Sequence, residues 1–342
     1  MPCAETLIGV AYRVRFRSKI FHESADPKQR KVLRMITGKQ LLKRTCLVSY
    51  ATERFERVRQ ELNESARRFG ISHLLSYCEQ DLRSSSYYEQ NQSILDEVCG
   101  AGYWAWKPFF IQEAMRQVGD DDLIIYCDAG SMFIQSPEPL LDLCVNNSTG
   151  LVLFDAKPLT NRQFTKRDCF VRMGCDGPKY WNENIVIATI IIVRKWSGAV
   201  AFVNEWLKHC CDRSAITDDP NVCGLPDLEG YAQHRCDQAI LSVLAAKYSL
   251  ETFRNPTVWG NFLKLRECRV EGEKVTSPYG LVPSIQGYSS APQANSPYGT
   301  ILEINRLPNY VGKKPLVMAT SGQRERRRTV LLTRLRRLLS KA

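Results

Sequence analysis

The sequence predicts an α/β fold in which a central, mostly parallel sheet is flanked by helices. The first segments with a clear apolar pattern have the order strand, helix, strand. Short apolar runs then alternate with amphipathic helical segments. A strand–helix–strand unit places its two strands side by side and parallel. A length of 342 residues and an apolar content of 44% allow one large domain with a sizeable core.

The first unit lies between residues 45 and 77. The apolar stretch 45–51, "TCLVSYA", predicts a strand. In residues 53–70 apolar side chains recur at three- and four-residue spacing, and Gly70 marks the end of a helix. The stretch 71–77, "ISHLLSY", predicts the second strand.

The later elements follow the same alternation. They are predicted as helices 87–98 and 108–118, strand 123–127, strands 150–156 and 186–193, and helices 199–211 and 234–248. Pro108 suits the first turn of its helix, because a proline there removes no helical hydrogen bond. Beyond Phe253 the chain is rich in proline and glycine and is predicted to form mostly loops.

The net charge of +11 is concentrated at the two ends of the chain. Residues 1–44 carry +8 and residues 323–342 carry +7, which leaves −4 between them. A protein that binds nucleic acid needs a basic face on its folded body, so we expect no nucleic-acid partner. The same pattern predicts a basic N-terminal extension at 1–44, one domain at 45–320 and a basic C-terminal helix or tail at 321–342.

The C-terminal segment has the pattern of an amphipathic helix. Its leucines, at positions 331, 332, 335, 338 and 339, fall on one helical face, and arginines occupy the other. Such a helix suits an anionic membrane surface or a groove on a partner. A helix docked on its own domain, or a frayed tail, explains the pattern equally simply.

Cysteine usage and the lack of a targeting segment indicate a reducing compartment. The thirteen cysteines are scattered and form no C-x-x-C pair, which predicts free, mostly buried thiols. The N-terminal "AYRVRFRSKIF" is too charged for a signal peptide, and no apolar run is long enough to span a membrane. We therefore expect a cytoplasmic protein, peripheral at a membrane if the C-terminal helix binds one.

An acidic residue follows the apolar strand in "DLIIYCDAG". Asp128 comes directly after the run, and Ala129 and Gly130 after it are small. Open α/β sheets bind ligands at the carboxyl ends of their strands, and a buried carboxylate needs a cation or a hydroxyl beside it. Small neighbours let a ligand approach the backbone. A turn cap is the simpler alternative; Asp155, after "GLVLF", is a second acid of this kind.

Two other polar clusters accompany this acid. "GAGYWAWKP" places Trp106 beside Lys107, a pair that can cover a ring and bind a phosphate, or act as core anchors. The second cluster, "HRCDQ", contains His234, Arg235, Asp237 and Gln238. Asp237 could equally be a helix N-cap and His234 a structural histidine.

In its ordered set of motifs the chain resembles nucleotide-sugar glycosyltransferases of the GT-A fold. The motifs are "GAGYWAWKPFFI", "DLIIYCDAG", "FTKRDCFVRMGCD", "IIIVRKWSGAVAFVNEWLKHC" and "HRCDQAILSVL". The resemblance spans about residues 45–253, most of the chain. The set is more specific than any one motif. A more distant likeness is to glycogenin-type transferases, which carry "DAD" at a strand end and a later "DQ" before a helix.

The resemblance implies a metal site. In GT-A enzymes a strand-end D-x-D motif holds a divalent metal, Mn²⁺ or Mg²⁺, against the diphosphate of the nucleotide sugar. Asp128 matches the first acid, and Gly130 stands where the second would be. His234 or Asp237 would then supply a further ligand; His234 matches the histidine that often does so. Lys107 and Arg167 could also offset the diphosphate charge directly.

The resemblance also implies donor-binding and catalytic residues. The residues expected to contact the donor are Trp106, Lys107, Asp128, Lys166, Arg167, Asp168, Arg235 and Gln238. Asp128 and Asp237 are the expected catalytic residues. Asp237 would position the acceptor hydroxyl, act as general base or contact the transferred sugar. The charged segment "TKRD" could instead be a solvated loop.

The expected activity is transfer of a hexose or pentose from a nucleotide sugar to a hydroxyl of a glycan or glycoprotein. A degraded GT-A protein that acts as a binding or membrane-associated module is the alternative, since one D-x-D acid is missing. A basic adaptor for nucleic acid or membrane fits less well, because the basic charge lies outside the folded body. A Rossmann dehydrogenase is excluded, because no G-x-G-x-x-G follows the first strand.

Overall fold

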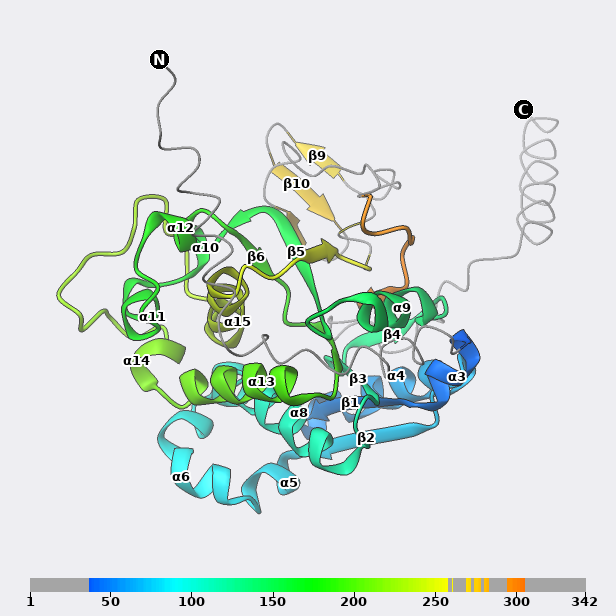
Figure 1. Ribbon diagram of the computed structural model, residues 1–342. Coiled ribbons are helices and arrows are strands. Elements are labelled where there is room, and N and C mark those ends of the chain that lie inside the picture. Colours follow the sequence, from blue (N-terminus) through cyan, green and yellow to red (C-terminus); the bar gives the residue numbers. More distant parts are fainter. Residues whose placement is uncertain are drawn as a thin grey trace, which may run out of the picture. The chain divides into compact units, whose positions relative to one another are not determined.

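The fold is seen in a computed structural model (Figure 1), which describes residues 37–257, 260, 269–271, 274–277, 280–282 and 294–304. The chain divides into two units, Met1–Asn305 and Arg306–Ala342, and every described element belongs to the first. The predicted C-terminal helix and most of the predicted N-terminal extension lie outside the described residues. The domain limits at 44 and 320 therefore stay a prediction.

From residue 38 to residue 254, one or two strands alternate with groups of one to four helical elements. The helices are α3 (Gly38–Lys43), the 3-10 turn η2 (Glu53–Phe55), α4 (Glu56–Arg68), α5 (Glu79–Arg83), α6 (Ser86–Leu95), α7 (Gly100–Tyr103), α8 (Trp106–Gln117), α9 (Glu138–Asn146), α10 (Asn161–Phe164), α11 (Arg167–Arg172), α12 (Pro178–Trp181), α13 (Ser197–Cys210), α14 (Arg213–Ile216) and α15 (Cys236–Lys247). The strands are β1 (Thr45–Ala51), β2 (His73–Cys78), β3 (Leu123–Cys127), β4 (Ser131–Phe133), β5 (Leu151–Thr160), β6 (Asn184–Val186), β7 (Ile190–Arg194), β8 (Thr252–Arg254), β9 (Arg269–Glu271), β10 (Lys274–Ser277), β11 (Gly280–Val282) and β12 (Leu302–Ile304).

The central sheet has seven strands in the order β2-β1-β3-β7-β5-β6, with β8 also paired to β5. β1 pairs in parallel with both β2 and β3, and β8 pairs in parallel with β5. β7 lies antiparallel between β3 and β5, and β6 is antiparallel to β5. Five strands therefore run one way and two the other, which confirms the predicted α/β class with a mostly parallel sheet between helices.

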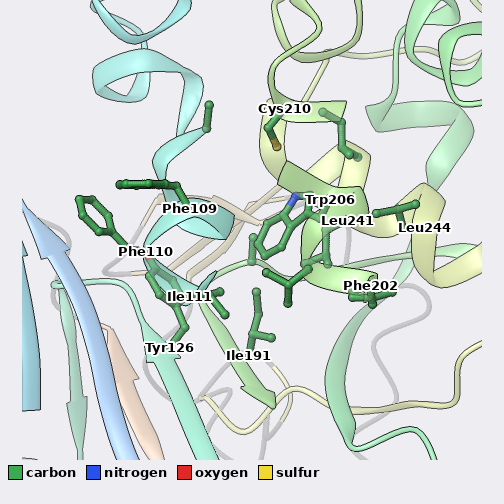
Figure 2. Packing of buried hydrophobic residues seen from close by; sticks show 14 of the residues in the cluster. Phe109, Phe110, Ile111, Tyr126, Ile191, Phe202, Trp206, Cys210, Leu241 and Leu244 are labelled. Atoms are coloured by element: carbon green, nitrogen blue, oxygen red, sulfur yellow. The ribbon is translucent and has the colours of Figure 1, made fainter. Parts of the chain in front are cut away.

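Both faces of the sheet are buried, and successive strand residues alternate between two cores. Val48 and Tyr126 pack on the face covered by α8, α13 and α15, whereas Leu47 and Ile125 pack on the face covered by α3, α4 and α9. This follows from the two-residue period of a strand. Figure 2 shows the first core, where Trp206 of α13 lies among side chains of α8, β3, β7 and α15.

One predicted strand is two strands in the structure. The run 186–193 was expected to be continuous, but β6 ends at Val186 and β7 begins at Ile190. The carbonyls of the break serve other partners: Ala188 O accepts a hydrogen bond from Lys107, and Thr189 O accepts one from the Asp128 N–H. Apolar sequence alone predicts one strand, because it carries no sign of these two contacts.

Two further features differ in detail from the sequence expectation. Within the range predicted as an extension, α3 buries Leu41 and Leu42 in the second core. After Phe253, in the region expected to be mostly loops, β12 pairs with β4 beside the sheet, and β9, β10 and β11 form a three-stranded sheet.

In the described part of the chain, no helix has both the length and the apolar character needed to cross a membrane.

The aromatic stack under β1 and β2 provides a test of the core. Phe110 is buried and stacks on Tyr77 and Tyr50, with ring centroids 4.3 and 5.4 Å away. Truncating a buried phenylalanine removes its transfer energy and leaves a cavity, so Phe110→Ala should lower the free energy of unfolding by about 3–5 kcal/mol. Phe55→Ala, at a side chain 37% exposed, should cost less than about 1 kcal/mol. Urea denaturation measures both; equal losses would contradict this packing.

Candidate functional site

Asp128 lies directly after β3, at the carboxyl end of the strand. Its N–H donates to Thr189 O at 2.9 Å, and its carbonyl accepts from the Ser131 N–H at 3.0 Å, so the chain turns sharply there. Its side chain is 17% exposed, which leaves the carboxylate reachable from solvent. The Tyr126 hydroxyl donates to its Oδ1 at 3.0 Å.

A buried lysine joins this carboxylate to a second one. Lys107, near the start of α8, places its Nζ 3.2 Å from Asp128 Oδ1 and 3.2 Å from Asp237 Oδ2. It also donates a hydrogen bond to Ala188 O at 3.3 Å. The Lys107 side chain is 5% exposed. Three residues predicted from separate motifs therefore meet at one ammonium group.

Asp237 is the more deeply buried of the two acids. It lies near the start of α15, and its side chain is 4% exposed. Burial raises the pKa of Asp237 to about 7; the Lys107 ammonium opposes this rise and the charge of Asp128 adds to it. Within the described part of the chain, no donor makes a well-directed hydrogen bond to Asp237 Oδ2, and its contact with Lys107 is an ion pair. A carboxyl group of this kind exchanges its proton near neutral pH.

A left-handed turn precedes Lys107. All five residues from Gly100 to Trp104 have positive φ, between 51° and 95°. The N–H groups of Tyr103 and Trp104 donate to the carbonyls four residues earlier, which closes the turn. A Cβ on Gly102 would lie 2.7 Å from Leu95 Cα, so only glycine fits there. Each non-glycine residue in this region costs about 1–2 kcal/mol, and such strain is often found at functional sites.

Aromatic rings surround the ammonium on its remaining sides. The rings of Trp106 and Tyr126 have centroids 5.9 and 5.8 Å from Lys107 Nζ. Trp106 is itself buried, packs on Tyr50 at 4.2 Å, and donates its Nε1–H to Gly100 O. The structure thus shows Trp106 packing around Lys107, and its contact with the donor stays a prediction.

Three groups of this site were missed by the sequence reasoning. They are the Tyr126 hydroxyl and the carbonyls of Ala188 and Thr189. A hydroxyl inside an otherwise apolar strand was the signal for Tyr126. No side chain signals a backbone carbonyl, so the other two could not be read from the sequence.

The "TKRD" segment holds a long loop in place. The Asp168 carboxylate accepts hydrogen bonds from the N–H groups of Val222 and Cys223 at 2.9 and 2.8 Å. Lys166 Nζ donates to Asp219 O at 3.0 Å, and its side chain is buried. Arg167 pairs with Asp176, and its backbone N–H donates to Asp227. These charged residues are therefore neither a solvated loop nor joined to Lys107.

The pKa of Asp168 reflects this anchoring. Burial by itself would raise it, but hydrogen bonds from the Cys223 side chain and from the N–H groups of Val222 and Cys223 lower it below its usual value. The carboxylate is thus charged at neutral pH and binds the loop over residues 217–230 as an anion.

His234 is held by both ring nitrogens. Its Nδ1 accepts from the Lys166 N–H at 3.2 Å, and this fixes Nε2 as the protonated nitrogen, 3.0 Å from Ala215 O. Burial, and after it the charge of Lys166, lower the pKa of His234 to about 4, while the hydrogen bond to Ala215 opposes the change. The ring is therefore neutral and has no nitrogen available for a metal in this arrangement.

Two of the remaining predicted residues lie at the start of α15, and the third lies in β5. Arg235 is partly exposed and places its guanidinium carbon 4.1 Å from the centroid of the Phe164 ring. Gln238 is also partly exposed. Asp155, the second strand-end acid, is buried and pairs with Lys157 at 3.0 Å. Asp155 therefore lies within β5 and pairs with a lysine of the same strand.

The residues predicted to bind a metal do not fit one in this arrangement. Asp128 already faces the Lys107 ammonium, Gly130 offers no carboxylate, and the His234 nitrogens are both engaged. Among the described residues, no group of three or more His, Cys, Asp or Glu side chains is placed to hold a metal ion. The predicted Mn²⁺ or Mg²⁺ stays a prediction from the resemblance.

Comparisons with known proteins do not place the chain in a family. No protein-family model matches the chain, and no curated protein matches it. Among solved structures it is similar to mouse xyloside xylosyltransferase 1 in its apo form, with 12% sequence identity and a TM-score of 0.36. The match covers 65% of this chain and 91% of that chain. A TM-score this low supports no conclusion about function.

The anchoring of the 217–230 loop can be tested at Asp168. Asp168→Ala leaves the N–H groups of Val222 and Cys223 without their partner, which should cost about 1–3 kcal/mol and loosen the loop. Limited proteolysis under native conditions should then cleave within the loop faster than in the unmodified chain. Glu229→Ala, which removes an exposed carboxylate from the same loop, should leave the cleavage rate unchanged. Equal rates in both variants would contradict the anchoring.

The buried neutral histidine predicts a pH dependence of stability. The folded-state pKa of His234 is about 4, against 6.5 when unfolded, so the unfolded chain binds more protons between these values. The stability contribution is complete above pH 6.5 and is lost as pH falls toward 4, by up to about 3 kcal/mol. His234→Gln keeps a donor and an acceptor but does not titrate. The stability difference between the two chains should shrink from pH 7.5 to 4.5; thermal unfolding measures it, and a constant difference would count against a neutral ring.

Proposed function

We propose that this chain is a GT-A-type glycosyltransferase that moves a sugar from a nucleotide-diphosphate donor to a hydroxyl of a glycan or glycoprotein. The observation that carries the proposal is the meeting of Asp128 and Asp237 at one ammonium, directly after a strand of the parallel part of the sheet. Enzymes of this architecture bind ligands at that edge. The ordered motifs that resemble the family supply these residues.

The proposed reaction exchanges one bond at the anomeric carbon for another. The bond between that carbon and the diphosphate oxygen breaks, and its electron pair leaves with the nucleoside diphosphate. The acceptor hydroxyl oxygen bonds to the same carbon, and its proton passes to a base. Fixed charges that favour the departing diphosphate and the acceptor proton's transfer would accelerate the step.

Exposure separates the roles of the two acids. The Asp128 carboxylate is the one that a ligand can reach, because its side chain is 17% exposed against 4% for Asp237. We assign direct contact with the sugar or its acceptor to Asp128. Asp237 lies deeper than Asp128 and helps to fix its position through Lys107. The pKa of about 7 lets Asp237 gain or lose a proton near neutrality.

Donor contacts are proposed for Arg235 and Gln238, which lie at the start of α15 beside Asp237 and are partly exposed. A guanidinium group suits a diphosphate. Lys166 and Asp168 act on the donor at most indirectly, by holding the 217–230 loop. Membrane contact through residues 321–342 and a cytoplasmic location remain predictions from the sequence.

A binding module without catalysis is the second candidate. The observation that favours it is the use of Lys166, Arg167, Asp168 and His234 in holding the fold, together with Gly130 in place of an acid. Such a module would bind a nucleotide or nucleotide sugar and turn none over.

The transferase proposal is tested with a panel of UDP-, GDP- and dTDP-sugars. The purified chain should release nucleoside diphosphate from at least one of them, and Asp128→Ala should lower that rate at least about 100-fold. Asp120→Ala serves as the matched control, because the Asp120 side chain is 89% exposed and pairs with Lys195 away from Lys107. Binding without turnover across the panel would favour the second candidate, and neither binding nor turnover would exclude both.

A further inference from the structure

We propose that the Lys107 ammonium takes the place of the divalent cation at this site, so that sugar transfer runs without a metal ion. The inference rests on the proposed transferase function and sharpens it. It replaces the metal expected from the resemblance with a cation that belongs to the chain itself.

The surroundings of Lys107 Nζ are those of a bound cation. Oxygens of Asp128, Asp237 and Ala188 lie at 3.2, 3.2 and 3.3 Å; the two carboxylate contacts are ion pairs, and the carbonyl accepts a hydrogen bond. Two carboxylates and a carbonyl are also the oxygen ligands that Mg²⁺, Mn²⁺ and Ca²⁺ prefer. A metal ion between the two acids would have to displace the ammonium or lie against it, and two cations repel each other.

The ammonium is fixed in this position by the rest of the fold. The Lys107 side chain is almost fully buried, the rings of Trp106 and Tyr126 flank Nζ, and the left-handed turn Gly100–Trp104 sets the start of α8. A flexible surface lysine could swing away to admit a metal. This one could leave only by giving up three oxygen partners in the protein interior.

The other positions that were expected to complete a metal site offer no ligand. Gly130 replaces the second acid of the motif, and both ring nitrogens of His234 are hydrogen-bonded. Loss of the second acid and gain of a buried lysine partner for the first acid fit together.

The first test measures turnover by the wild-type chain, using the donor that the panel of nucleotide sugars identifies. Turnover should be the same, within about twofold, in excess EDTA and in millimolar Mn²⁺. A loss of turnover in EDTA that Mn²⁺ restores would overturn the inference and leave the transferase proposal intact. Absence of turnover under every condition is a failure of the transferase proposal, and the binding experiment below then decides the inference alone.

The second test needs no activity. Lys107→Ala removes the ammonium and leaves two carboxylates and a carbonyl around a space, so this variant should gain a Mn²⁺ site. Electron paramagnetic resonance of added Mn²⁺ should show at least tenfold tighter binding by Lys107→Ala than by the wild-type chain. Lys247→Ala, which removes the lysine paired with Glu205 at 2.7 Å, should bind no more Mn²⁺ than wild type.

Wild-type binding keeps the inference falsifiable even if Lys107→Ala fails to fold. Stoichiometric Mn²⁺ binding by the wild-type chain that Asp128→Asn abolishes would overturn the inference. Equal weak binding by wild type and Asp128→Asn would support it.

Discussion

The contact of the Lys107 ammonium with Asp128 and Asp237 is the interaction on which the candidate site depends. It joins the start of α8, the end of β3 and the start of α15, three segments far apart in the sequence. Charges taken out of water are tolerated only when they are paired, and removing one partner leaves an uncompensated buried charge. The two acids can therefore lie together inside the protein only because the lysine lies between them.

The sheet makes this meeting possible. β3 is buried on both faces, between the core under α8, α13 and α15 and the core under α3, α4 and α9, so its direction and end point are fixed by packing. The break between β6 and β7 then frees the Ala188 and Thr189 carbonyls, which turn toward Lys107 and the Asp128 N–H. The strained turn Gly100–Trp104 completes the geometry from the side of α8. Local strain and lost strand pairing occur at the site, while the well-packed sheet supplies the stability that tolerates them.

Charged residues that look alike in the sequence have two different roles: some form the candidate site, and others hold a loop in place. Lys107 and Asp237 form the site, whereas Lys166 and Asp168 bind the backbone of residues 217–230. His234 belongs with the second group, because it connects Lys166 to Ala215 through its two ring nitrogens. A polar cluster next to a catalytic candidate is thus not by itself a binding cluster; the hydrogen-bond partners of each side chain decide.

The sequence by itself determined the fold class, most element positions and the three residues that meet at the site. The spacing of apolar residues located β1, α4, β3, α13 and α15. The buried face of a helix or strand requires apolar side chains, so its period is visible in the sequence. It could not show that the run 186–193 breaks, that Lys107 lies between two acids, or that His234 has no nitrogen to offer a metal. Those outcomes depend on backbone carbonyls and on contacts between residues distant in the chain. Only the tertiary structure decided them, because a buried charge takes its role from the partners that packing places beside it.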